Sequence, residues 1–136
     1  MQITEGAVFK EAFSFSQEEV KKFASVSGDY NPLHLDATYA ASTIFKQPII
    51  HGFLGASVFS KILGTKFPGE GTVYLKQSME FKRPMFVDVQ YEAVLTILQT
   101  DTEKHTAEIE TKILDKETGK LIVAGSASVL NKEKII

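Results

Sequence analysis

Two short polar stretches carry the side chains best suited to chemistry. The first is SGDYNPLH, residues 27–34, in which Asp29 and His34 lie five positions apart. A carboxylate is ionised at pH 7 and an imidazole titrates near that pH, so this pair could take a proton from water and return one. The stretch could equally be only a turn, in which Asp29 accepts hydrogen bonds from backbone amides. The residue types alone leave both interpretations open.

The second stretch, PIIHG at residues 48–52, leads into an apolar run through a glycine. A helix start leaves backbone N–H groups unpaired and carries a partial positive charge, so the Gly52 N–H could bind the oxygen of a polarised carbonyl. Alternatively, Gly52 only allows close packing, and His51 only caps the helix or fills space. The third histidine, His105, is expected to be solvated at a charged strand edge. The three histidines lack metal-ligand spacing, so no metal is expected.

The elements that must position these residues change in type near residue 70. Ser16 and Glu19 have the spacing of a capping box, which predicts a helix over residues 17–26. The segment 52–63 is apolar on nearly every side, as in a buried core helix, and Asp36 precedes a short helical turn. Strand-like alternation covers residues 72–81, 87–99, 104–114 and 121–130, with an edge strand at 8–15. The pattern predicts an α+β fold, in which an antiparallel sheet curls around one apolar helix.

Composition limits the class of protein. The 136 residues are expected to form a single domain, residues 1–136. Cysteine is absent, which excludes disulfides, thiolate zinc sites and a cysteine nucleophile, and we expect a cytoplasmic location. Fifteen Lys plus Arg against seventeen Asp plus Glu give a net charge of -2, so neither nucleic acid nor a membrane is an expected partner. The tail at residues 131–134 is expected to be solvated.

The two polar stretches together resemble a known signature. SGDYNPLH followed by PIIHGFLGAS, with the later segment MEFKRPMFV, is similar to the MaoC-like (R)-specific enoyl-CoA hydratases of the hydratase 2 type. The resemblance implies a hot dog fold, in which an antiparallel sheet wraps a long central helix. It also implies reversible hydration of a trans-2-enoyl-CoA to the (R)-3-hydroxyacyl-CoA by a hydro-lyase of fatty acid metabolism. No cofactor is implied, since coenzyme A is part of the substrate, and a homodimer is the expected assembly.

The resemblance assigns roles residue by residue. Asp29 and His34 match the catalytic pair, and the Gly52 N–H matches the donor to the thioester oxygen. Asn31 matches the motif residue that helps to hold the loop. Ser60 matches a supporting serine of the active site, with Ser57 one turn earlier as the alternative.

Further residues are candidates for binding the substrate. Phe53, Leu54 and Val58 could line an acyl tunnel, although burial in the core is an alternative for each. Lys82 and Arg83 are an adjacent basic pair near a turn, so they could bind the nucleotide phosphates or simply be solvated. The chain departs from the family pattern around Asp88, where a Gly followed by Asp is common.

Three other functions remain open at this point. A hot dog acyl-CoA thioesterase would use the same Gly52 donor but would attack the carbonyl carbon and release free thiol. A 3-hydroxyacyl-carrier-protein dehydratase would perform the same chemistry on another carrier. In a non-catalytic acyl-thioester binding module, Asp29 and His34 would point away from each other.

Overall fold

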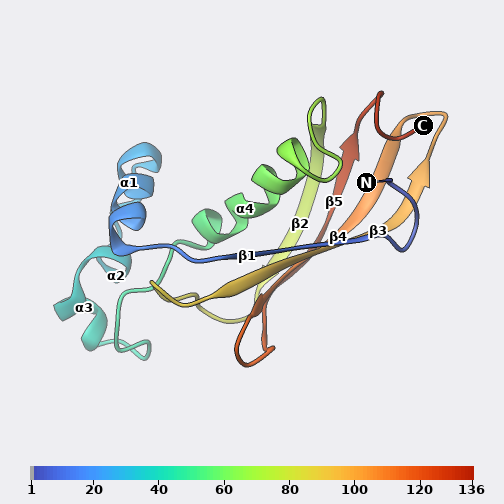
Figure 1. Ribbon diagram of the computed structural model, residues 1–136. Coiled ribbons are helices and arrows are strands. Elements are labelled where there is room, and N and C mark those ends of the chain that lie inside the picture. Colours follow the sequence, from blue (N-terminus) through green and yellow to red (C-terminus); the bar gives the residue numbers. More distant parts are fainter. Residues whose placement is uncertain (1) are drawn as a thin grey trace.

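A computed structural model describes residues 2–136 and has the α+β arrangement that the sequence predicts (Figure 1). Within these residues, five strands form one antiparallel sheet in the order β1-β3-β4-β5-β2. The strands are β1 (Val8–Phe13), β2 (Val73–Phe81), β3 (Tyr91–Asp101), β4 (Thr106–Asp115) and β5 (Leu121–Leu130). The helices are α1 (Gln17–Ser27), α2 (Pro32–Leu35), α3 (Ala37–Ala41) and α4 (Gly52–Thr65). The predicted edge position of the first strand is confirmed.

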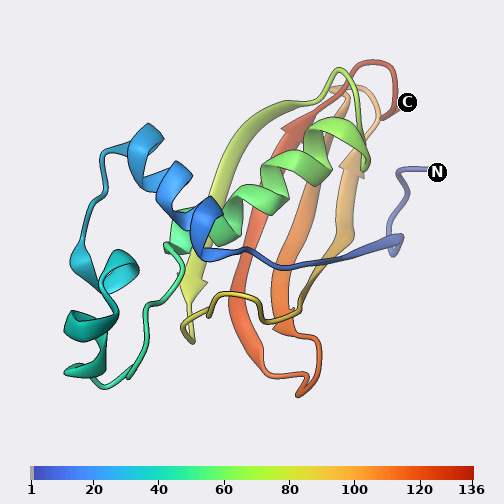
Figure 2. The ribbon, with the colours of Figure 1, turned by 60° about the vertical axis from the view of Figure 1, so that its left-hand side comes forward.

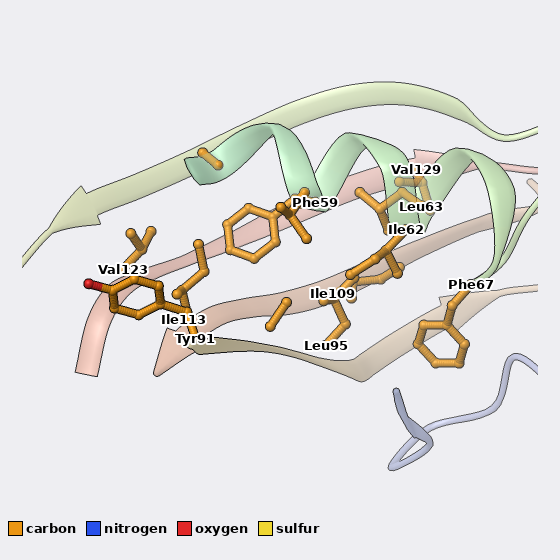
Figure 3. Close-up of a cluster of buried hydrophobic side chains, with 14 of the residues drawn as sticks. Phe59, Ile62, Leu63, Phe67, Tyr91, Leu95, Ile109, Ile113, Val123 and Val129 are labelled. Carbon is orange, nitrogen blue, oxygen red and sulfur yellow. The ribbon is translucent and has the colours of Figure 1, made fainter. Parts of the chain in front are cut away.

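Helix α4 lies along one face of the curved sheet (Figures 1 and 2). The buried side chains of the hydrophobic core lie between the helix and the sheet. Figure 3 shows Phe59, Ile62 and Leu63 of α4 within this core, among side chains from the strands. Their fully buried neighbours in the cluster include Leu95, Ile109, Ile113, Val123 and Val129. Each large side chain buried in this way contributes about 1.5–3 kcal/mol. Packing along its length therefore fixes where the first turn of α4 lies.

The capping box of α1 is present as predicted. The Glu19 N–H donates to Ser16 Oγ at 3.2 Å, and the Ser16 N–H donates to Glu19 Oε1 at 2.9 Å. The helix ends at Gly28, whose φ of 79° lies in the left-handed region that glycine adopts at little cost. The chain therefore leaves α1 directly into the segment that carries Asp29.

Several strand boundaries differ from the prediction by one or two residues, and the start of β3 differs most. Strand β3 begins at Tyr91 rather than at residue 87, because the preceding residues form a turn in which Asp88 has a φ of 60°. The left-handed region is where glycine is least strained, and Asp88 stands where the chain departs from the family pattern. Strand β3 also continues to Asp101, whose carboxylate accepts two backbone N–H groups of the turn before β4.

Two residues expected to be solvated are buried or half-buried, although residues 132–134 of the predicted solvated tail are exposed. His105 is half-buried in the turn before β4, where its Nδ1–H donates to the Ile135 carbonyl at 2.8 Å. Asn131 is fully buried, and its amide donates to the Glu70 carbonyl and to Thr72 Oγ1, both at 3.0 Å. These bonds hold the C-terminal tail against the body of the protein, which the polar composition of the tail does not reveal.

Within residues 2–136, no helix has both the length and the apolar character needed to cross a membrane.

Candidate active site

The SGDYNPLH stretch is not a simple loop, because its second half forms the short helix α2. Asn31 is the N-cap of α2, and its Oδ1 accepts the Leu33 N–H at 3.0 Å. Pro32 occupies the first helical position, where its missing N–H costs nothing. His34 therefore lies on a helix rather than in the loop that the sequence analysis expected. An Asn-Pro pair at a helix start is a signal that could have identified α2.

Asp29 sits in the turn between α1 and α2. Its carboxylate Oδ1 accepts the Asn31 N–H at 3.2 Å, and its own N–H donates to Ser27 Oγ at 3.1 Å. The side chain is exposed. The turn interpretation of Asp29 is therefore correct, but a carboxylate that accepts one backbone N–H still has lone pairs available for another donor.

The His34 ring is held in one tautomer. Its Nδ1 lies 2.7 Å from the Ile49 carbonyl oxygen, which can only accept, so Nδ1 carries the hydrogen. In the neutral ring, Nε2 then carries no hydrogen and has a free lone pair. The side chain is buried, with 9% of its surface exposed. His34 is therefore placed to accept a hydrogen bond from water through Nε2.

Burial also decides the charge of His34. Loss of solvent lowers the pKa of the imidazole from 6.5, and the neighbouring His51 acts in the same direction. The bond to the Ile49 carbonyl and the charge of Asp29 raise the pKa, but burial has the larger effect. His34 is thus neutral at pH 7, which the acceptor role of Nε2 requires.

The fold brings a third group to this pair. One ligand atom each from Asp29, His34 and His51 lies within 4.8 Å of the other two. A single water with heavy-atom hydrogen bonds of about 2.6–3.2 Å could bridge groups at such separations. The wide spacing of the histidines along the chain was therefore a poor argument against a metal, because folding brings two of them together. The absence of a metal stays a prediction.

The start of α4 borders the same region. Gly52 is the first residue of α4, and its N–H has no hydrogen-bond partner among residues 2–136. A Cβ at this position would lie 2.7 Å from the Phe81 ring, so a larger residue would displace that ring. The unpaired N–H and the positive end of the helix fit the predicted role in binding a carbonyl oxygen.

Two hollows flank this helix start. One, of about 430 Å³, is lined by residues that include His34, Gly52, Phe53 and Phe81. The other, of about 360 Å³, lies between α4 and β2 and is lined by residues that include Phe53, Ser57 and Ser60. Phe53 borders both, as expected of a residue lining an acyl tunnel.

Some of the candidate site residues do not line either hollow. Leu54 and Val58 are buried in the core, which favours the packing alternative. Asp29 and Asn31 line neither hollow, so Asp29 reaches the site through its proximity to His34. Ser57 and Ser60 both line the second hollow. The Ser57 hydroxyl donates to the Leu54 carbonyl at 2.5 Å. The active-site roles of the two serines remain a prediction.

The basic pair borders the first hollow. Lys82 and Arg83 both line it and both are exposed. Lys82 forms an ion pair with Glu80 at 2.8 Å. An exposed ion pair contributes little, roughly 0–1 kcal/mol, so it would not prevent Lys82 from binding a phosphate.

The antiparallel sheet around one central helix is the hot dog fold, and solved structures of similar sequence share it. An (R)-hydratase from Aeromonas caviae involved in PHA biosynthesis matches with a TM-score of 0.90 at 41% identity, covering 94% of this chain and 96% of that chain. An R-hydratase from Pseudomonas aeruginosa matches with a TM-score of 0.89 at 35% identity, covering 96% and 83%.

Sequence comparison assigns the family. Residues 2–120 match the MaoC like domain, and the chain belongs to this family. The chain is 44% identical over 115 residues to an (R)-specific enoyl-CoA hydratase of Aeromonas caviae, covering 85% of each. It is 33% identical over 127 residues to a mitochondrial 3-hydroxyacyl-[acyl-carrier-protein] dehydratase of Arabidopsis thaliana, covering 92% of this chain and 75% of the relative.

We predict that His34 titrates below 6.5 when its ring signals are followed by NMR against pH, with His34→Gln used for assignment. Burial lowers the pKa in the folded state, so the unfolded chain binds this proton at a higher pH. The His34 contribution to stability should accordingly be lost as pH falls from 6.5 through the folded pKa. A titration at or above 6.5 would contradict the neutral acceptor.

Proposed function

We propose that the protein is an (R)-specific enoyl-CoA hydratase that adds water to a trans-2-enoyl-CoA and gives the (R)-3-hydroxyacyl-CoA. The observation that carries this proposal is the Asp29 carboxylate beside His34, together with the hollow that both His34 and Gly52, with its unpaired N–H, line. The names of the Aeromonas relatives support it, since both are hydratases of (R) specificity. The reaction is reversible and belongs to the hydro-lyases of fatty acid metabolism.

The mechanism needs one water between Asp29 and His34. Asp29 accepts a proton from this water as its oxygen adds to C3, while His34 Nε2 orients the water. The negative charge that gathers on the thioester oxygen is stabilised by the Gly52 N–H. His34 begins without a proton on Nε2, so the proton that reaches C2 is the one that Asp29 took from the water. Asp29 gives this proton to C2, and both groups regain their starting protonation states.

Two alternatives make different products or use a different carrier. A thioesterase needs water aimed at the carbonyl carbon, whereas Asp29 and His34 together suit a water that also exchanges a proton with C2. A dehydratase acting on carrier-protein thioesters shares the chemistry and is the named activity of the Arabidopsis relative. We favour coenzyme A because Lys82 and Arg83 at the rim of the hollow offer charges to its phosphates.

The proposal asks for no metal and no cofactor beyond the coenzyme A of the substrate. Asn31 caps α2 and so supports the loop between Asp29 and His34. Ser60 and Phe53 are proposed to contact the acyl chain, because both line the hollow between α4 and β2. A cytoplasmic location remains the expectation from the cysteine-free sequence.

The direct test uses crotonyl-CoA. We expect loss of the conjugated double bond, an intact thioester and the (R)-3-hydroxy product. Asp29→Asn and His34→Ala should each lower turnover by about 100-fold or more, because each removes a proton-transfer or water-orienting group. Circular dichroism checks the fold of both variants, and exhaustive chelation should leave turnover unchanged.

Other outcomes would contradict the proposal. Free coenzyme A released in step with substrate loss would indicate a thioesterase, and an (S) product would exclude the proposed geometry. Wild-type turnover in a folded Asp29→Asn variant would remove Asp29 from the mechanism. Activity that chelation abolishes and zinc restores would show that the clustered imidazoles serve a metal.

We also propose that the protein is a homodimer that pairs through β2. This strand is an end of the sheet, so one side of its backbone is unpaired. Val73, Leu75 and Phe81 of β2 are about half exposed, at 51%, 53% and 49%, and Phe53 of α4 is 68% exposed. Apolar side chains gathered along an open edge favour pairing with a second copy about a two-fold axis.

Light scattering after size exclusion should give about twice the 15.1 kDa chain mass. Leu75→Glu should shift the protein toward the monomer, since it places a charge on the proposed interface. Leu98→Glu is the matched control, because Leu98 is 51% exposed but lies on β3. A wild-type monomer, or dissociation by Leu98→Glu alone, would contradict pairing through β2.

A further inference from the structure

His51 makes two contacts with the proposed catalytic pair. Its Nε2 lies 3.0 Å from the backbone carbonyl oxygen of Asp29, and its ring stacks on that of His34 with centroids 3.9 Å apart. The ring also packs against Phe23 of α1, with centroids 4.9 Å apart. Only 2% of His51 is exposed. One buried side chain thus contacts α1, the Asp29 turn and α2 from the start of α4.

The hydrogen-bonding state of His51 follows from its partner. A carbonyl oxygen only accepts, so Nε2 carries the hydrogen, and the other ring nitrogen is Nδ1. This Nδ1 is buried and has no partner among residues 2–136. Buried polar atoms are normally satisfied, and an exception calls for an explanation. The imidazole therefore leaves Nδ1 unsatisfied, while its Nε2–H donates to the Asp29 carbonyl.

Neither helix capping nor space filling, the two roles considered for His51 from the sequence, accounts for these contacts. The side chain makes no capping bond at the start of α4, although His51 is the N-cap residue. Filling space against Phe23 and His34 would need only an apolar ring, which would leave no unsatisfied nitrogen. The hydrogen bond to the Asp29 carbonyl is the feature that only a donor supplies.

We infer that His51 is a positioning residue that holds the main chain of Asp29 at a fixed distance from the start of α4. The peptide that follows His51 carries the Gly52 N–H, so one residue ties the proposed base to the proposed donor for the thioester oxygen. A substrate must meet both groups at once, C3 near the water and the carbonyl oxygen near Gly52. This inference rests on the proposed hydratase function.

The test compares His51→Phe with His51→Gln, using crotonyl-CoA hydration. Phenylalanine keeps an aromatic ring and removes the donor, so we expect kcat to fall by about tenfold to a hundredfold with KM unchanged, as for misplaced catalytic groups. Glutamine extends an N–H to about the position of Nε2 and should restore most of kcat. His105→Phe is the matched control, because His105 also donates to a backbone carbonyl but lies in the turn before β4. It should keep wild-type kcat.

A double variant separates positioning from a general loss of structure. If His51 acts through Asp29, His51→Phe should cost little further activity in the Asp29→Asn background, and the two effects should not add. Additive losses, or wild-type kcat in His51→Phe, would overturn the inference, as would equal losses in the Gln and Phe variants. An inactive wild type would instead refute the hydratase function, so the two failures are distinguishable.

Discussion

The hydrogen bond from His34 Nδ1–H to the Ile49 carbonyl is the contact on which the site depends. It fixes the tautomer and leaves Nε2 as the acceptor that faces the water in the proposed mechanism. The carbonyl is itself held, because Ile49 bridges to Phe86 and the Ile50 N–H donates to the Met85 carbonyl at 2.8 Å. The segment 85–86 is tied to β3, because the Phe86 N–H donates to the Tyr91 hydroxyl of β3 at 2.7 Å. The state of the imidazole therefore depends on the sheet, through backbone contacts.

Burial and hydrogen bonding oppose each other at His34, and the outcome matters for the chemistry. The bond to Ile49 and the charge of Asp29 favour the imidazolium, yet loss of solvent has the larger effect and lowers the pKa. A neutral ring can accept from water, which a charged ring cannot. The core beneath α4 thus acts on the chemistry indirectly, since it holds Gly52 and His51 next to this buried ring.

The sequence predicted the core helix and the edge strand, because each has a local signal. The residue types left the proximity of Asp29 and His34 open, and only the family resemblance implied it. Helix α2 was missed although Asn31 and Pro32 mark its start. The role of His51 could not be predicted, since its bond to Asp29 joins residues 22 positions apart, and packing of α1, α2 and α4 decides such contacts. The argument against a metal was weak for the same reason, because it relied on the spacing of the histidines along the chain and folding brings His34 and His51 together. Residues 132–134 of the tail are exposed as predicted, whereas Asn131 turns inward.

The central claim is that one water, held between Asp29 and His34, supplies both the oxygen at C3 and the proton at C2. Hydration of crotonyl-CoA in deuterium oxide, stopped early and analysed by NMR, tests it most directly. A single water acting from one side predicts one diastereomer of the (R) product, with deuterium at C2 and the hydroxyl at C3 added to the same face. A mixture at C2, or addition to opposite faces, would contradict the account.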